Sequence, residues 1–237
     1  MTRHSKVIKK IHRAELAYLK LREAIIEQAM APGMKLPEDV IGGHFGISRT
    51  LVRTALVKLQ NEGLVDIRTN KGAAVAHPSI EEAREVFAVR HTLERQAVPL
   101  VIAHWSAQIE AALLEHVGLE EAAVAKESPV SIRLAGEFHI KLAEFSGNGL
   151  LKRYITELVS RSSLILALYG RPHSSECAVN EHKELIDAFR SGNKEKAIDL
   201  MTHHLGAVEE RALLKSGLPD PPALEQILRE RFPSSST

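Results

Sequence analysis

The feature that most constrains this chain is a glycine turn followed by a polar stretch and by apolar residues at helical spacing. Gly46 permits a tight turn, and Val52, Leu56 and Leu59 recur after it on one face of a helix. The polar side chains of the first turns fall on another face: Ser48, Arg49, Thr50 and Arg53. One face can pack in a core while the other stays outside, a pattern typical of a recognition helix that binds DNA.

The segments on either side complete a winged helix-turn-helix, in which a two-stranded hairpin follows three helices. The pattern predicts, in order, a helix over 13–30, a short helix reaching 45, the recognition helix ending near 61, and strands over 64–68 and 73–76. Gly42 and Gly43 lie inside the short helix, where each glycine costs about 1 kcal/mol relative to alanine. The basic N-terminus lacks the apolar stretch of a secretion signal, and we expect a flexible leader there.

A linker follows at residues 77–79, where Ser79 and Glu82 have the spacing of a capping box that opens a new helix. From there the pattern predicts helices over 80–104, 106–126, 129–146, 148–169, 175–191 and 193–215, separated by short breakers. We therefore expect a mainly α chain in three parts. They are a winged helix-turn-helix domain over 1–77, an antiparallel all-helical bundle over 78–217, and a C-terminal tail over 218–237.

Charge is distributed unevenly behind a net charge of +1. Residues 1–77 hold 13 Lys and Arg against 7 Asp and Glu, an excess of +6, whereas the remainder holds 18 against 23, or −5. Phosphates are attracted to the first part and repelled by the second. The single cysteine excludes an internal disulfide framework, and no apolar run approaches the ~20 residues that span a bilayer, so a cytoplasmic location is expected.

These residues resemble the GntR family of bacterial transcriptional regulators, in the FadR-type branch with an FCD effector domain. In the first domain the resemblance rests on Pro32-Gly33, Leu36, Gly46-Ile47-Ser48-Arg49-Thr50, Val52-Arg53, Ala55-Leu56, Leu59, Glu62-Gly63-Leu64-Val65 and Gly72. In the second it rests on Val86-Phe87, Arg90, Leu93-Glu94, Phe138-His139, Ser146-Gly147-Asn148, Glu181-His182 and His204-Leu205. The resemblance covers nearly the whole chain.

The resemblance implies a homodimer whose recognition helices enter successive major grooves of double-stranded DNA, with the wings near the minor groove. A pseudo-palindromic operator follows from the two-fold symmetry. Arg49 and Arg53 are the candidates for contacts with base edges or phosphates, and Ser48 and Thr50 for contacts with the backbone. On the wing, the candidates are Arg68, Lys71 and Gly72.

Three histidines, His139, His182 and His204, lie on separate predicted helices at positions that match the FCD metal site. Imidazoles that converge in a bundle core bind zinc, nickel or a similar divalent ion. The resemblance also implies an aspartate one helical turn before His139, but Ala135 occupies that position. The identity of the metal and its occupancy are therefore open, and the alternative is a metal-free cavity that binds an acid directly.

Arg90 occupies the position of a family arginine that faces the effector, and its guanidinium can clamp a carboxylate. An ion pair with Glu94, four residues on, is the alternative. The function expected is that of a repressor that senses a small organic acid and alters its operator affinity. Two other functions stay open: a metal-dependent hydrolase with a three-histidine centre, and an architectural DNA-binding protein with a purely structural bundle.

Overall fold

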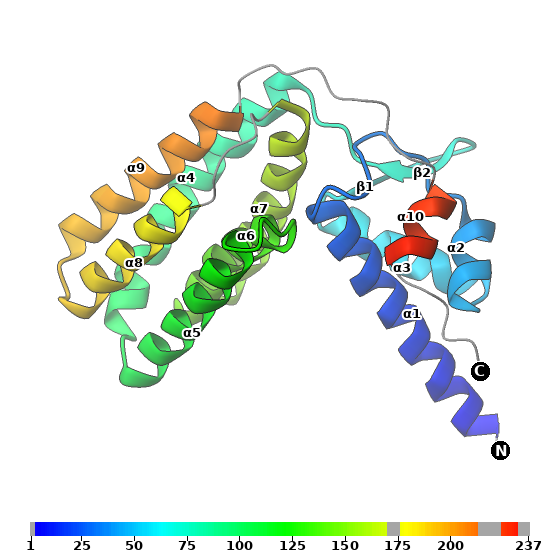
Figure 1. Ribbon diagram of the computed structural model, residues 1–237, viewed down its shortest axis with the longest axis horizontal. Coiled ribbons are helices and arrows are strands. Elements are labelled where there is room, and N and C mark those ends of the chain that lie inside the picture. Colours follow the sequence, from blue (N-terminus) through cyan, green and yellow to red (C-terminus); the bar gives the residue numbers. More distant parts are fainter. Residues whose placement is uncertain (1–2, 170–175, 213–223, 232–237) are drawn as a thin grey trace. The chain divides into compact units, whose positions relative to one another are not determined.

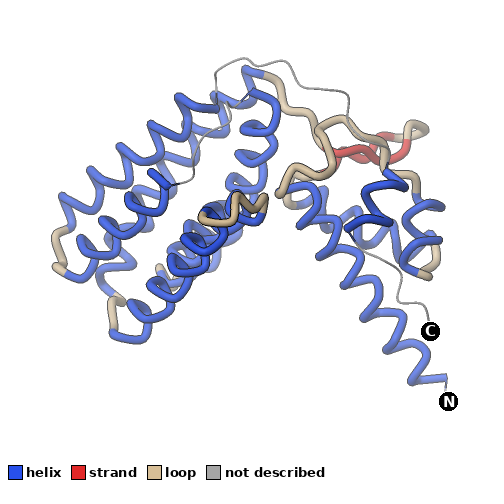
Figure 2. Tube along the Cα trace, viewed as in Figure 1, coloured by secondary structure: helices blue, strands red, loops and turns tan. Residues whose placement is uncertain are grey.

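The computed structural model describes residues 3–169, 176–212 and 224–231. By its contacts the chain divides into two units, Met1–His77 with Gly217–Thr237, and Pro78–Ser216. Figure 1 shows the elements of each unit, and Figure 2 shows that the strands described belong to one hairpin in the first unit. Among the helices of the described residues, none is both long and apolar enough to cross a membrane.

The first unit is a winged helix-turn-helix with one additional helix. Its elements are α1 (Arg3–Ile26), α2 (Glu38–Phe45), α3 (Arg49–Asn61), β1 (Val65–Arg68), β2 (Gly72–Val75) and α10 (Leu224–Arg231). The strands are antiparallel, with Val65 opposite Val75. The core between the helices contains Leu21, Leu56 and Leu59, each at most 1% exposed. The apolar residues that predicted the recognition helix thus bury one face of α3, as expected.

The turn between α2 and α3 requires glycine at two positions, for different physical reasons. Gly46 ends α2 with a left-handed φ of 62°, a conformation that glycine adopts readily because it lacks a Cβ. A Cβ on Gly42 would lie 2.9 Å from the carbonyl oxygen of Ile47. Gly42 is therefore required by the close approach of the chain that enters α3, which offsets its low helix propensity.

Helix α1 begins at Arg3, so the expectation of a flexible leader is wrong for residues 3–12. The segment contains neither glycine nor proline before Pro32. Once the packed half of α1 has formed, each further residue adds a backbone hydrogen bond at little cost, and the helix extends toward the N-terminus. At its other end α1 is fixed to the end of α3, where Arg22 Nε donates to Glu62 Oε2 over 2.7 Å.

The second unit, over its described residues, is an antiparallel bundle. Its helices are α4 (Ile80–Ala103), α5 (Ala107–Val124), α6 (Val130–Phe145), α7 (Gly149–Tyr169), α8 (Glu176–Arg190) and α9 (Lys194–Ala212). The Ser79 hydroxyl accepts the Glu82 amide over 3.1 Å, as the capping box predicts. The main core joins five helices through Val98, Leu113, Phe138, Phe189 and Met201. The expected mainly α fold class is confirmed.

The C-terminal segment differs from the expected separate tail over 218–237. Residues 217–237 group with the first unit, and within them Leu224, Ile227 and Leu228 are buried. Their spacing gives α10 an apolar face, and burying that face stabilises the helix against the first unit. The predicted helix boundaries at 175 and 215 lie outside the described residues.

Candidate metal centre and nucleic-acid interface

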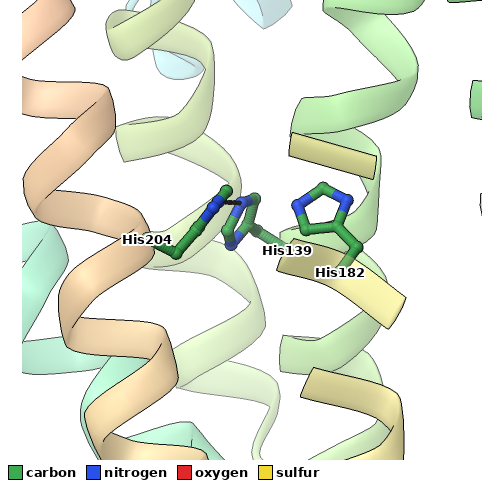
Figure 3. A group of neighbouring side chains, drawn as sticks. All are labelled: His139, His182 and His204. Atoms are coloured by element: carbon green, nitrogen blue, oxygen red, sulfur yellow. Dashed lines mark hydrogen bonds between the residues drawn. The ribbon is translucent and has the colours of Figure 1, made fainter. Parts of the chain in front are cut away.

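Three buried imidazoles meet inside the second unit. His139 on α6, His182 on α8 and His204 on α9 are 3%, 0% and 2% exposed, and their ligand nitrogens lie within 4.8 Å of one another. Figure 3 shows the three rings, whose centroids are 4.9–5.4 Å apart in every pairing. The Nε2 atoms of His139 and His204 are 3.1 Å apart. Two nitrogens bound to one tetrahedral zinc lie about 3.3 Å apart, so this pair already has nearly that separation.

A glutamate lies beside the other nitrogen of each ring. The Nδ1 atoms of His139 and His204 lie 2.5 Å from Oε2 of Glu94 and of Glu181, respectively. The third contact joins His182 Nδ1 to Glu120 Oε2 over 2.8 Å. Each glutamate belongs to a different helix from its histidine. When Nδ1–H donates to a carboxylate, Nε2 keeps its lone pair, and the imidazole is oriented to bind a metal.

Burial and charge keep two of these imidazoles neutral. Burial lowers the pKa of His139 to about 4, although the Glu94 carboxylate acts against this shift. Burial, together with the other positive groups nearby, also lowers the pKa of His182. For Glu94, burial by itself would raise the pKa, but Arg90 and His139 outweigh it and lower the pKa to about 2. The neutral imidazole is the form that binds a metal ion.

Two buried atoms lack a hydrogen-bond partner in the described structure. They are Nε2 of His182 and Oε1 of Glu120. Burial raises the pKa of Glu120 to about 8, so the carboxylate form is costly where no cation is near. On the far side of Glu120, His116 Nε2 donates to the carbonyl oxygen of Leu134 over 2.9 Å. A cation bound at His182 Nε2 would give this nitrogen a partner. Its positive charge would also favour the carboxylate form of Glu120.

The donor set fits a borderline divalent ion such as zinc or nickel. Three imidazoles suffice for a catalytic type of zinc site that keeps a position open. Ala135 supplies no ligand atom, but the three glutamates, when all are ionised, and the Arg90 guanidinium sum to a charge of −2. A divalent cation would therefore bring this buried cluster to neutrality without an aspartate at position 135.

Arg90 forms the ion pair that was the alternative to an effector contact. Its side chain is 4% exposed, and Nε donates to Glu94 Oε1 over 2.5 Å. The nearby crevice between side chains is too narrow to hold a water molecule, is mainly apolar and does not include Arg90 in its wall. The residues lining it are Glu94, Ala97, Val98, Val101, His139, Leu142, Ile155, Phe189 and Met201. Arg90 thus acts on the histidine cluster through Glu94.

Sequence reasoning missed Glu120 and Glu181 as partners of the histidines. Glu181 precedes His182 in the chain but contacts His204, because neighbours on a helix point about 100° apart. A signal was present for Glu120, since His116 and Glu120 are separated by four residues and so share a helix face. Their distance from His182 in the sequence gave no indication of the contact.

The residues predicted to contact DNA lie at the start of α3 and are exposed. Ser48 is the residue before the helix, and Arg49, Thr50 and Arg53 follow it. The Arg53 guanidinium donates from Nε and Nη2 to the two carboxylate oxygens of Glu38, over 3.0 and 3.2 Å. Arg49, by contrast, has no ion pair among the described residues. The edge of Arg53 that would pair with a guanine is thus already engaged.

The predicted wing residues lie at the tip of the hairpin. Arg68 ends β1 and lies 3.4 Å from the Asp66 carboxylate, Lys71 is exposed, and Gly72 begins β2 with a φ of 77°. Asn70 also has a left-handed φ, of 62°. These two positions let the chain reverse tightly and leave the basic side chains of the wing at the surface.

Comparisons with known proteins agree with both units. A model described as bacterial regulatory proteins, gntR family, matches residues 13–75, and a model of the FCD domain matches residues 85–207. The HTH-type transcriptional regulator YdhC of Bacillus subtilis is 29% identical over 187 residues, covering 76% of this chain and 82% of that protein. The HTH-type transcriptional repressor RspR of Escherichia coli is 25% identical over 199 residues, covering 81% and 86%.

One solved structure shows the same fold over most of the chain. The structure of McbR/YncC from E. coli has a TM-score of 0.73 at 21% identity and covers 82% of this chain and 94% of that one. At this identity the similarity concerns the fold alone.

Proposed function

Because this chain belongs to the GntR family of bacterial regulatory proteins and carries an FCD domain, we propose that it represses transcription in response to a small organic acid. It is a transcriptional regulator and not an enzyme, and the hydrolase alternative is set aside on that ground. The finer proposal is that its FCD domain senses the acid through a bound divalent ion, zinc or nickel. The similarity to a named repressor, RspR, supports the direction of the response.

The observation that carries the proposal is the orientation of the three imidazoles. Their ligand nitrogens lie close together while each Nδ1 faces a glutamate. The three Nε2 atoms would hold the ion, and the ion would supply a positive point for a carboxylate of the effector. Ala135 offers no carboxylate to the ion, so a carboxylate of the effector would take that role.

The second cationic group is Arg90, which holds Glu94 and so orients His139. A direct contact between Arg90 and the effector stays a prediction. Since Glu94 links the arginine to the histidine, an acid that binds the ion changes the balance of both contacts. Helices α4, α6 and α9 would then shift relative to one another.

On the DNA side, we propose a homodimer on a pseudo-palindromic operator, with α3 in the major groove. Arg49 would read bases, while Ser48 and Thr50 would contact phosphates and fix the register. Arg68 and Lys71 would contact the backbone from the wing, where Gly72 provides the turn. The basic balance of residues 1–77 supports this assignment.

The test is metal analysis of the purified protein and of His182→Ala, with His203→Ala as the matched control, because His203 neighbours His204 but is exposed. We expect the first variant to lose zinc and the control to keep it. DNA from upstream of its own gene is then titrated with each protein, with and without zinc and simple carboxylic acids. Unchanged metal content in His182→Ala would overturn the metal centre, and indifference to every duplex would overturn the regulator.

A further inference from the structure

Helix α10 packs against the first unit although it follows the second unit in the sequence. Leu224, Ile227 and Leu228 are 6%, 5% and 1% exposed, and their spacing places them on one face of the helix. Gln226 and Glu230 are exposed. The helix is therefore docked through an apolar face, and it lies beyond the residues that either family model matches.

An ion pair accompanies the apolar contact. Arg231 Nη2 pairs with Glu27 Oε2, and the two side chains are 27% and 4% exposed. Glu27 follows the last residue of α1, within the helical core of the first unit. A carboxylate as buried as this one is costly when it loses a cationic partner. The contact thus gives α10 a defined position on the first unit as well as an apolar surface to cover.

The chain consequently passes between the two units twice, at residues 77–78 and 216–217. The helices nearest to these crossings are α4, which begins at Ile80, and α9, which ends at Ala212. Both contribute to the surroundings of the histidine cluster, since α9 carries His204 and α4 carries Glu94, the partner of His139. The two helices that connect the second unit to the first are thus two of those that would respond to a ligand at the cluster.

We propose that α10 is a second attachment between the units and couples the histidine cluster to the DNA-binding unit. A unit attached at one point can turn freely about its linker, whereas two attachments restrict the positions it can take. A shift of α9 relative to α4 then changes those positions. The effect of this coupling on DNA binding rests on the proposed function. The attachment of α10 to the first unit does not depend on it.

The first experiment measures the attachment without DNA or metal. Leu228→Asp places a charge in the apolar face and should release α10, while Gln226→Asp adds the same charge on the exposed face. Backbone ¹⁵N relaxation gives a rotational correlation time for each unit. We expect similar values for both units in the natural protein and in Gln226→Asp, and a fall to about half in the first unit of Leu228→Asp. Equal correlation times in Leu228→Asp would overturn the proposal.

A second variant covers the case in which Leu228→Asp unfolds the first unit. Arg231→Glu leaves the apolar face intact but opposes Glu27 with a like charge. It should free the first unit in the same measurement, and the exchanged pair Glu27→Lys with Arg231→Glu should restore it. If Arg231→Glu folds and its units still tumble together, α10 is not held as proposed.

The second experiment measures the coupling with zinc alone as the probe. The ratio of DNA dissociation constants with and without zinc is determined for the same variants. Leu228→Asp should bring this ratio close to 1 while zinc affinity is retained, and Gln226→Asp should leave it unchanged. A full zinc effect in Leu228→Asp would overturn the coupling. If the natural protein shows no zinc effect, the proposed metal sensing fails, and the relaxation measurement still decides the attachment.

Discussion

Glu120 lies between two histidines and shows how much of the candidate metal centre depends on residues outside any motif. It is 1% exposed, faces Nδ1 of His182 and lies 3.4 Å from Nε2 of His116. Its partners come from α8 and from its own helix. Removing its charge should disturb His182 without removing a metal ligand.

Glu120→Gln should therefore lower zinc affinity. The amide replaces a charged acceptor, so His182 is held less firmly and is a weaker base. Loss of such an outer partner costs about 10- to 100-fold in metal affinity. Competition with a chromophoric chelator measures the change, and Glu121→Gln is the control, because Glu121 is exposed and pairs with Lys183 at the surface. Equal affinities of the two variants would show that Glu120 does not orient the ligand.

Arg49 and Arg53 differ in whether the guanidinium group already has an acidic partner in the protein. Arg53 is held by Glu38 through two hydrogen bonds, whereas the described structure gives Arg49 no ion pair. An arginine whose donors are free can give them to a guanine without losing a protein contact. Arg49 is therefore the stronger candidate for base reading.

We expect Arg49→Ala to weaken operator binding by about 1–3 kcal/mol and to relax specificity at one base pair. Arg53→Ala should have the smaller effect, because the donors of Arg53 are already engaged by Glu38. Fluorescence anisotropy with the operator and with single-base variants measures both. Arg84→Ala, an exposed change in the second unit, serves as the control. A larger loss in Arg53→Ala than in Arg49→Ala would reverse this assignment.

Among the secondary-structure elements, α6 and α7 are joined by a turn that a small hydrogen-bonded motif fixes. The Ser146 hydroxyl donates to the Ala143 carbonyl over 2.6 Å, and Asn148 Oδ1 accepts the amides of Leu150 and Leu151. Between them Gly147 has a φ of 70°, and a Cβ there would lie 2.9 Å from Cε1 of His104. The turn that follows α6, the helix of His139, thus requires a glycine.

Gly147→Ala should destabilise the second unit by about 1–3 kcal/mol, through backbone strain and the clash with His104. Gly149→Ala is the matched control. Gly149 begins α7, a Cβ at this position would meet nothing within 4 Å, and alanine is the better helix former there. Urea denaturation followed by circular dichroism compares the two. A Gly147→Ala protein as stable as the control would contradict the strain argument.

The cross-helix pairs also make the bundle sensitive to acid. The pKa of His139 falls from 6.5 to about 4 on folding, so the unfolded chain binds more protons between these values. The contribution of His139 to the free energy of unfolding is complete above pH 6.5 and is lost as the pH falls toward 4. The pKa of Glu94 is lowered from 4.5 to about 2, so the stability that its carboxylate contributes is lost as the pH falls below 4.5.

For the metal-free protein, we expect the His139 imidazole to contribute a fall of about 2 kcal/mol in the free energy of unfolding of the second unit between pH 7 and pH 5. Glu120, whose pKa is raised to about 8, acts in the opposite direction, so the His139 contribution is measured as a difference between the natural protein and His139→Gln. Urea titrations at the two pH values measure it. His139→Gln cannot titrate and should reduce the dependence. If the natural protein and His139→Gln show the same change in stability between the two pH values, the imidazole is not held neutral by burial.

Over the whole molecule, the two units should respond differently to metal. The histidine cluster lies wholly within the second unit. A ligand that binds only the folded form stabilises it by about 2.7 kcal/mol at 100 times its Kd. In calorimetry, zinc should raise the unfolding temperature of the second unit and leave that of the first nearly unchanged. EDTA should reverse the shift, and His182→Ala should show none. An equal rise of both transitions would contradict a site confined to one unit.

The division into helices was largely predictable, because helical periodicity, caps and turn glycines act over a few residues. Ser79 with Glu82 gave the start of α4, and Gly46 gave the turn before α3. Helix α1 was underestimated, since nothing in residues 3–12 opposes a helix once the following turns are packed. The docking of α10 was not predictable, because its apolar face does not specify which surface it covers.

Local spacing in the chain was enough to predict the winged helix-turn-helix and the helical bundle, and the resemblance to the FCD domain singled out the three histidines as a candidate ligand set. Packing between distant segments settled the rest: which carboxylate faces which imidazole, that Glu38 engages Arg53, and that α10 rejoins the first unit. The physical reason is the range of the interactions. Spacing along a helix fixes which side chains share a face, but contacts between helices depend on how the whole chain packs.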